Sequence, residues 1–358
     1  MSVMKFKKSS FQLLFASCIA SSMVSAPLLA QTTSEKPQSQ ITFSDPAKKA
    51  DVGADFLKQA VRYDRSVGEV DVVINLGQQT YPALHGIVED IAREHGIKVN
   101  VQRGSCGTTA RKLLKKTIDI GTYCCPPGRS DRLPGLKFHT VAIAPLALVT
   151  NTTNPVNNVS AIDAQKIFRG DYVYWSDVPD SDQQQAEKLS AQLTAKKIKP
   201  VVRLHCKKRP GHWRLLLKDA DSFSPVIQEV SVIPDMIKNV AEDISAIGYE
   251  TPYMLEVHKN KGKLKILSID GIDPNDLSQL TNGNYPIYRT YNMTTWSNPE
   301  NHNAKAEALL KYIIEYVESH GEEYGFITAS RLRQAGWKFL DGELIAAPDG
   351  MPVISEHQ

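Results

Sequence analysis

The sequence has few cysteines and lacks the common motifs of metal- and nucleotide-binding enzymes. It holds 5 cysteines in 358 residues, with no C-x-x-C pair and no paired Cys/His pattern of zinc-site spacing. A Gly-rich nucleotide loop, a metalloprotease helix motif and a prominent acidic pair are also missing. These absences remove the usual motif-based arguments for catalysis, so we expect a protein without enzyme activity and without a cofactor.

The sequence also has little net charge. Its formal charge is +3 at pH 7, and Lys5, Lys7 and Lys8 account for all of it. A sequence-independent nucleic-acid binder needs a basic surface that releases counterions, so we expect no nucleic-acid partner. One local basic cluster is interpreted mainly as solvated surface. Its members are Arg203, Lys207, Lys208, Arg209 and Arg214.

Long apolar runs are missing beyond the N-terminus. Basic residues precede an apolar stretch from Phe11 to about Ala20, and small residues follow it up to Ala30, which is the pattern of a secretory signal peptide. No later segment approaches the roughly 20 apolar residues of a membrane helix. We therefore expect residues 1–30 to be a signal peptide and the protein to be periplasmic. Cys18, in a partial lipobox, offers a less favoured alternative, a lipid-modified N-terminus.

The remaining chain is long enough for two domains of roughly 100–200 residues. We expect residues 31–69 to form a polar linker and one extra amphipathic helix, from Asp45 to Tyr63. Strand and helix patterns then alternate from Val70 onward, and the apolar run Val141–Val149 is predicted to be a buried strand. Such alternation predicts α/β architecture, with parallel sheets and ligand turns at the carboxyl ends of strands.

Several short stretches, taken together and in order over roughly residues 70–340, identify a family resemblance. They are Thr80-Tyr81-Pro82, Asp119-Ile120-Gly121, Val141-Ala142-Ile143-Ala144, Asn154-Pro155-Val156, Ile167-Phe168-Arg169-Gly170, Trp175-Ser176-Asp177, Ala246-Ile247-Gly248-Tyr249, Ile269-Asp270-Gly271-Ile272 and Tyr285-Pro286-Ile287-Tyr288-Arg289. In these the chain resembles the periplasmic phosphate-binding proteins and their relatives, the extracytoplasmic subunits of bacterial ABC importers.

The resemblance implies a two-lobed Venus-flytrap fold with two chain crossings that act as a hinge. The first lobe is expected over residues 70–150 and again over 248–345, the second lobe over 151–247, and a tail over 346–358. The crossings are expected near Leu146 to Asn151 and near Gly248 to Thr251. The resemblance also implies a monomer that delivers its solute to an ABC permease or to a sensor protein.

The resemblance further implies an oxyanion site, because helix N-termini offer N–H donors and the positive end of the helix dipole. The positions that match are Gln78, Gln79, Thr80, Ser105, Cys106, Gly107, Thr108, Tyr123, Cys124, Cys125 and Arg203. At two places the sequence departs from the pattern that family members use to bind phosphate. Tyr123-Cys124-Cys125 replaces the acidic residue that commonly follows the Asp-Ile-Gly run, and Pro210-Gly211-His212 replaces a turn of serine, glycine and threonine.

The cysteines leave three alternatives open. The four that follow the signal peptide could form disulfides, the usual fate in an exported protein, with three possible connectivities. They could instead bind a soft ion such as copper, zinc or arsenite. The residues of that site are Cys106, Cys124, Cys125, Cys206 and His205. A thiol-dependent enzyme built on Cys206 is the remotest alternative, because no oxyanion hole or orienting acid accompanies it.

Overall fold

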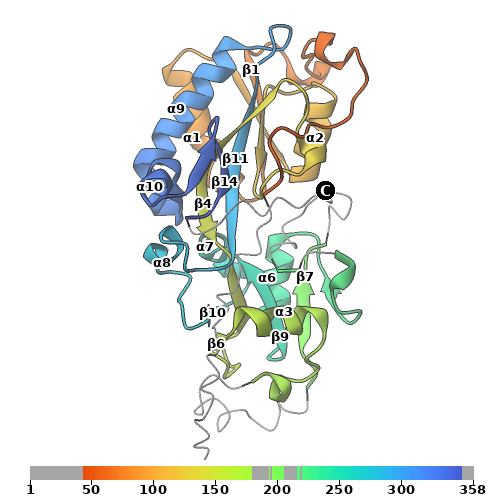
Figure 1. Cartoon of the computed structure of the whole chain (residues 1–358), viewed down its shortest axis with the longest axis vertical. Helices are drawn as coiled ribbons and strands as arrows, with labels where there is room; N and C mark the ends of the chain where they lie inside the picture. Colours follow the sequence, from red (N-terminus) through yellow and green to blue (C-terminus); the bar gives the residue numbers. More distant parts are fainter. Residues whose placement is uncertain (1–42, 180–192, 194–195, 205–215, 218–219, 349–358) are drawn as a thin grey trace, which may run out of the picture. The chain divides into compact units, whose positions relative to one another are not determined.

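A computed structural model describes residues 43–179, 193, 196–204, 216–217 and 220–348. Within these ranges the chain forms two six-stranded sheets and one separate two-stranded hairpin. Helices pack on both sheets, so the architecture is the predicted two-lobed α/β fold (Figure 1).

The first sheet carries the strand order β12-β4-β11-β3-β1-β2. Its strands are β1 (Val72–Gly77), β2 (Val99–Gly104), β3 (Ile120–Tyr123), β4 (Leu136–Pro145), β11 (Tyr288–Trp296) and β12 (Ile327–Thr328). Successive residues of β1 face opposite sides, as the pleat of a strand requires. Val72 and Ile74 pack against α1 (Tyr81–Glu94) and α9 (Ala304–His320), whereas Val73 packs on the side of α2 (Cys106–Leu114).

The second sheet carries the strand order β6-β10-β5-β9-β7-β8. Its strands are β5 (Ala147–Asn151), β6 (Asn158–Val159), β7 (Lys199–Val202), β8 (Gln228–Glu229), β9 (Ala246–Glu250) and β10 (Leu264–Ile269). The helices α3 (Ala161–Arg169) and α6 (Ile233–Glu242) bury apolar faces in the core of this lobe. The remaining elements are α7 (Pro252–Val257), α8 (Leu277–Thr281), α10 (Ala329–Gln334) and the hairpin β13 (Lys338–Leu340) with β14 (Glu343–Ala346).

Both sheets are mixed, which corrects the expectation of parallel sheets. β1 runs parallel to β2 and β3, and β7 runs parallel to β8 and β9. β11, however, runs antiparallel to β3 and β4, and β5 runs antiparallel to β9 and β10. The reason is the path of the chain: β4 leads out of the first sheet toward the second and β11 leads back, so the two strands must run in opposite directions.

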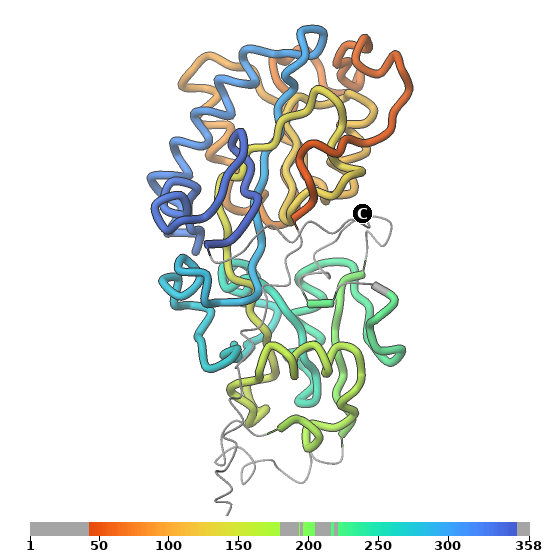
Figure 2. Tube along the Cα trace, in the orientation of Figure 1, coloured from red at the N-terminus to blue at the C-terminus, as the bar shows by residue number. Residues whose placement is uncertain are grey.

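The chain crosses between the sheets at two neighbouring points (Figure 2). The run Val141–Val149 is two strands rather than one, because the single residue Leu146 separates β4 from β5. Leu146 N donates to Ile287 O at 3.0 Å, and the Tyr285 hydroxyl donates to Leu146 O at 3.0 Å. The return crossing therefore lies just before β11.

The first crossing lies within the predicted stretch, at Leu146, but the predicted second crossing near Gly248 to Thr251 is wrong. β10 follows that point in the chain and still pairs with β5, so the second sheet continues to Ile269. The strand at that point, β9, is instead an interior strand of the second sheet, between β5 and β7.

The extra helix predicted from Asp45 to Tyr63 is also wrong in the part that the structure describes. One short 3-10 turn, Phe56–Lys58, lies in this stretch instead, and a second, Arg65–Val67, follows it. Pro46 and Gly53 interrupt the helical pattern, since proline removes a donor and glycine is a poor helix former. Phe56 is nonetheless buried, in contact with Trp296.

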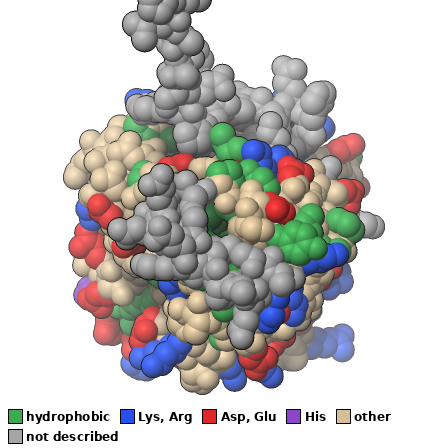
Figure 3. All heavy atoms as spheres, turned by 90° about the horizontal axis from the view of Figure 1, so that it is seen from below, with side chains coloured by type: hydrophobic (Ala, Val, Ile, Leu, Met, Phe, Trp, Pro, Cys, Tyr) green, Lys and Arg blue, Asp and Glu red, His purple; other side chains and the backbone are tan. Residues whose placement is uncertain are grey.

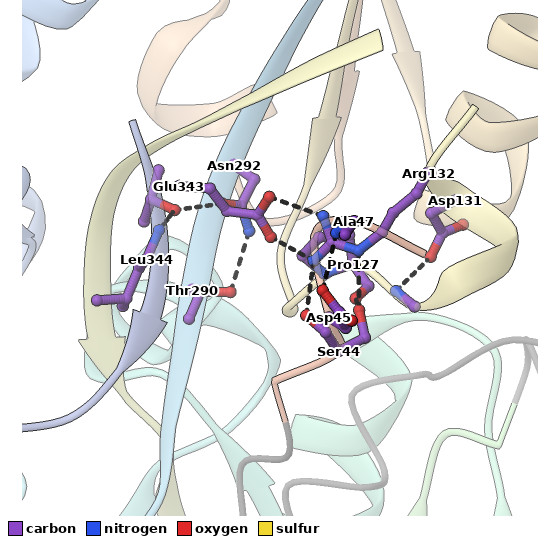
Figure 4. Close-up of polar contacts among 12 residues, drawn as sticks. Ser44, Asp45, Ala47, Pro127, Asp131, Arg132, Thr290, Asn292, Glu343 and Leu344 are labelled. Carbon is purple, nitrogen blue, oxygen red and sulfur yellow. Dashed lines mark hydrogen bonds and ion pairs between the residues drawn. The ribbon is translucent and has the colours of Figure 1, made fainter. Parts of the chain in front are cut away.

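Arg132 connects two other segments to the first lobe, the hairpin of β13 and β14 through a buried ion pair and the N-terminal segment through a hydrogen bond (Figure 4). Arg132 donates from Nη1 to Glu343 Oε2 at 2.7 Å and from Nη2 to Glu343 Oε1 at 2.5 Å. The same guanidinium donates from Nε to Ser44 Oγ at 3.0 Å. Because its donors meet acceptors from both segments, this arginine has a structural role in the first lobe.

The surface carries charges of both signs. On the face shown in Figure 3, Lys and Arg side chains are interspersed with Asp and Glu, in keeping with the small net charge of the sequence. Across the described ranges, no helix is both long enough and apolar enough to cross a membrane.

Candidate functional site

The carboxyl ends of β1, β2 and β3 bring three predicted turns to one edge of the first sheet. The parallel register pairs Gly77 with Gly104, and β3 lies on the other side of β1. The turns that follow these strands begin at Gln78, Ser105 and Cys124. They meet at this edge because parallel strands end at the same side of a sheet.

The first turn is held tightly and reaches the second lobe. Gln79 and Thr80 are buried, with 3% and 2% of their surface exposed. Thr80 Oγ1 lies 3.3 Å from Thr122 Oγ1, and Thr122 Oγ1 accepts from Gly77 N at 2.7 Å. Gln79 Nε2 donates to Glu250 Oε1 in the second sheet at 2.7 Å. The side chain of Gln79 is therefore a direct link between the lobes.

The second turn caps α2. Ser105 adopts an extended backbone conformation and its Oγ accepts from Thr108 N at 3.3 Å, which is the ordinary N-cap arrangement for serine. Ser105 Oγ also lies 3.2 Å from Thr108 Oγ1. Cys106 and Gly107 follow as the first helical residues. The predicted hydroxyls are thus together, and the positive end of the helix dipole lies beside Cys106.

Cys106 and Cys124 are in sulfur contact. Their Sγ atoms are 3.3 Å apart and unbonded, whereas a disulfide needs about 2.05 Å. Both residues are half-buried. Cys125 is buried, and its carbonyl accepts from Asn292 Nδ2 at 3.2 Å. The neighbouring Tyr123 ring packs against Phe138 in the core, so its ring belongs to the lobe interior.

The second lobe contributes Arg203 and Glu250 from adjacent parallel strands. Arg203 directly follows β7 and Glu250 ends β9. Arg203 Nη2 donates to Glu250 Oε2 at 2.5 Å, and its backbone N–H donates to the Tyr249 hydroxyl at 3.2 Å. Arg203 is 2% exposed and Glu250 is fully buried. The predicted arginine is therefore held rigidly by a carboxylate that was not predicted.

Arg289 is the second functional candidate that the sequence reasoning missed. It lies near the start of β11, which runs antiparallel to β3 with Asn292 opposite Tyr123. The start of β11 therefore extends past the end of β3, beside Cys124. Arg289 is fully buried; its Nη1 donates to Cys124 Sγ at 3.9 Å, and its Nη2 lies 3.7 Å from Glu250 Oε1.

A usable sequence signal existed for both missed residues. Arg289 interrupts a strand that otherwise carries no charge, and Glu250 ends the apolar run Ala246–Tyr249. A charged side chain in a strand that is buried on both faces needs a partner. Each of these charges therefore marks a candidate site residue, and the structure supplies the pairing.

The two arginines keep N–H donors without acceptors. Among the described residues, no hydrogen-bond partner reaches Arg203 Nε, Arg289 Nε or Arg289 Nη2. Buried polar groups are almost always paired in folded proteins. A cluster of unpaired guanidinium donors from both lobes is therefore an arrangement suited to a bound anion.

The thiols share this electrostatic environment. The hydrogen bond from Cys106, a contact with Cys125 and the positive charges of Arg289 and Arg203 hold the pKa of Cys124 well below its usual range. The same contact with Cys124, followed by burial, raises the pKa of Cys106. Burial opposes the charge of Arg289, but Glu250 and then Cys124 hold its pKa above the usual value. Of the two thiols, Cys124 is therefore the one that ionises more readily.

The soft-metal alternative gains no support. Within the ranges that the structure describes, no group of three His, Cys, Asp or Glu side chains could hold a metal ion. Cys206 and His205, two of the five predicted ligands, lie outside the described residues, as do Pro210 and His212. The disulfide alternative is not observed among the described cysteines, because Cys106, Cys124 and Cys125 are unbonded.

Comparisons with known proteins agree with this architecture. The phosphate transport receptor of Vibrio cholerae superposes with a TM-score of 0.56 at 20% identity, covering 72% of this chain and 99% of that one. A phosphate ABC transporter substrate-binding protein of Clostridium perfringens, with bound phosphate, gives a TM-score of 0.59 at 16% identity, covering 72% and 99%. At these identities the likeness concerns the fold.

Sequence comparison gives the family. Phosphate-binding protein PstS 2 of Streptococcus agalactiae, in serotypes V and III, is 26% identical over 123 residues, which is 34% of this chain. The aligned part spans 42% of the length of those relatives. The family described as the PBP superfamily domain matches residues 65–316. The chain therefore belongs to the periplasmic binding protein (PBP) superfamily.

Proposed function

We propose that this protein is an exported, non-catalytic solute-binding protein that holds a small oxyanion between its two lobes. Arg203 and Arg289 bind the anion directly, and the turns at Thr80 and Ser105 complete the site. The ligand is of the size and charge of phosphate, and the protein presents it to an ABC permease or to a sensor protein.

Three unpaired N–H donors on buried guanidiniums carry this proposal. Arg203 Nε, Arg289 Nε and Arg289 Nη2 have no hydrogen-bond acceptor among the described residues. Leaving a buried donor unpaired costs about 1–3 kcal/mol, and more for a charged group. A ligand with several acceptor oxygens removes this cost at all three positions. Arginine forks also match the geometry of tetrahedral and planar oxyanions.

The local charge is suited to an anion. Arg203 and Arg289 carry two positive charges, and Glu250 supplies one negative charge to both of them. The N-termini of α1 and α2 add their dipoles at the same edge of the sheet. Ser105 and Thr108 contribute hydroxyl groups there, and these can donate to a ligand oxygen.

The wider context supports transport rather than catalysis. The similar proteins are named as phosphate-binding proteins and phosphate receptors, and the N-terminal sequence pattern favours export. Phosphate itself is the narrower part of the proposal, because the acidic residue expected after Asp119-Ile120-Gly121 is replaced by cysteines. Glu250 is the carboxylate available in its place, but it already accepts from Gln79 and Arg203.

Calorimetric titration of the exported protein with phosphate, arsenate and sulfate tests the proposal. We expect saturable binding of at least one anion at one site per chain, and its loss in Arg289→Gln. Arg331→Gln is the matched control, because Arg331 forms an exposed ion pair with Glu322 and is not part of the proposed site. Absence of binding to every anion, or binding that Arg289→Gln leaves intact, would overturn it. Tight binding of copper, zinc or arsenite alone would favour the soft-ion alternative.

A further inference from the structure

The sulfur pair lies at the boundary of the proposed anion site. Cys106 comes from the start of α2 and Cys124 from the end of β3, and their Sγ atoms are 3.3 Å apart. An approach of roughly 1 Å would allow a covalent bond of about 2.05 Å. Both residues are half-buried rather than sealed in the core.

The oxidation state of the same pair sets the charge of the sulfur beside Arg289. In the described part of the chain, Cys124 Sγ is the hydrogen-bond acceptor of the Arg289 guanidinium, at 3.9 Å from Nη1. With Cys124 as a thiolate, the charges of Arg203, Arg289, Glu250 and Cys124 cancel. With an uncharged sulfur in that position, one positive charge remains.

We propose that Cys106 and Cys124 form a reversible disulfide that strengthens oxyanion binding at Arg289. The inference rests on the proposed function, since it describes how that site is regulated. A thiolate at Cys124 competes with the ligand for Arg289, whereas a disulfide sulfur is uncharged and a weak acceptor. Oxidation therefore exchanges an internal counterion for an external one.

The chemistry balances with an external disulfide as oxidant. The Cys124 thiolate attacks one sulfur of the external disulfide, breaks its S–S bond and expels one thiolate. Cys106 then loses its proton and attacks Cys124 Sγ in the mixed disulfide, expelling the second half as a thiol. The pair loses two electrons and the external disulfide gains them, being reduced to one thiolate and one thiol.

Thermodynamic linkage makes the coupling between oxidation and anion binding reciprocal. If oxidation raises anion affinity by some factor, bound anion must favour the disulfide over the dithiol by the same factor. Coupling between two sites typically amounts to about 5- to 150-fold. For a two-electron couple, a tenfold change corresponds to about 30 mV in midpoint potential. The anion affinity in each redox state and the midpoint potential with and without anion can be measured independently of each other.

The first test is titration of the exported protein with inorganic phosphate, after treatment with oxidised glutathione or with a reducing agent. We expect about 5- to 150-fold tighter binding after oxidation. Peptide mapping should locate the bond between Cys106 and Cys124. Cys106→Ser should keep the affinity of the reduced protein under both conditions. The surface variant Arg331→Gln, at an exposed ion pair with Glu322, should retain the redox response.

Three outcomes would overturn the inference while leaving the proposed function standing. They are equal affinities in the two redox states, a response that survives in Cys106→Ser, and a response that is lost in Arg331→Gln. Failure of phosphate, arsenate and sulfate to bind in either state would instead overturn the proposed function. A redox titration with and without phosphate is the second test: bound phosphate should lower the midpoint potential, and an unchanged potential contradicts the coupling.

Discussion

Gln79 Nε2 donates a 2.7 Å hydrogen bond to Glu250 Oε1, although the two residues are 171 positions apart in the chain. Gln79 lies after β1 in the first sheet, and Glu250 ends β9 in the second. Thr251 Oγ1 adds a longer bond to Gln79 Oε1, at 3.4 Å. The proposed site is therefore assembled from both lobes, and changes in either lobe should affect it.

Replacing either buried arginine by lysine should weaken anion binding at least tenfold. Lysine keeps the positive charge but loses the planar fork that donates two parallel hydrogen bonds. Titration calorimetry of Arg203→Lys and Arg289→Lys measures the effect, with Arg169→Lys as the control because Arg169 forms an exposed ion pair with Asp171. Full affinity in both site variants would show that charge alone suffices and that the guanidinium geometry has no role.

Glu250→Gln should destabilise the protein by about 3–5 kcal/mol, because it removes the carboxylate between two buried arginines. Denaturant unfolding measures this loss. Added phosphate should recover part of it, since a ligand that binds the native state stabilises it. Glu322→Gln, at an exposed ion pair, should leave the free energy of unfolding essentially unchanged. Wild-type stability in Glu250→Gln would contradict the ion-pair assignment.

Gly104→Ala should destabilise the first lobe by about 1–3 kcal/mol. A Cβ atom at Gly104 would lie 2.5 Å from Asn75 Oδ1, the atom that accepts from Thr109 Oγ1. Gly86→Ala is the matched control, since Gly86 is exposed in α1 with nothing within 4 Å of a new Cβ. The control should gain about 0.5–1 kcal/mol. Equal behaviour of the two variants in thermal or denaturant unfolding would refute this contact.

The thiols of Cys106 and Cys124 should ionise in two separated steps. The lowered pKa of Cys124 means that its stabilising contribution is full above its ordinary pKa and is lost as pH falls through the lowered value. The raised pKa of Cys106 contributes in the opposite sense, below its ordinary pKa. Rates of alkylation against pH, followed by mass spectrometry, should show Cys124 reacting at lower pH than Cys106. Matching profiles near the ordinary thiol pKa would be inconsistent with the contact.

The sequence predicted the two-lobed α/β architecture correctly, but it did not predict the direction of every strand or the point at which the chain returns to the first lobe. Alternating strand and helix patterns were sufficient for the units around β1, β2 and β3, because each hydrophobic pattern reports local burial. Strand direction in β11 and the position of the second crossing depend on pairing between distant segments. Within the apolar run Val141–Val149 the local mark of the crossing at Leu146 is Pro145, which lacks the N–H donor that a continuous strand needs.

The candidate site was predicted unevenly for a similar reason. The turns at Gln79, Ser105 and Cys124 follow strands, so their meeting at one sheet edge could be expected. Arg203 was identified by the family resemblance, and its role in binding stays a prediction. Glu250 and Arg289 were missed although each is an isolated charge in a buried strand. The sequence does not say which residues pair with them, and their contact exists only after both sheets are placed together.

The most direct test is a crystal structure of the exported protein grown with phosphate or arsenate at a concentration that saturates binding in calorimetry. We predict one tetrahedral anion within hydrogen-bond distance of Arg203 Nε and of Arg289 Nε or Nη2, in contact with the turns after β1 and β2. An anion bound elsewhere, with these three donors still facing no ligand, would contradict the central claim that the buried arginines form the binding site.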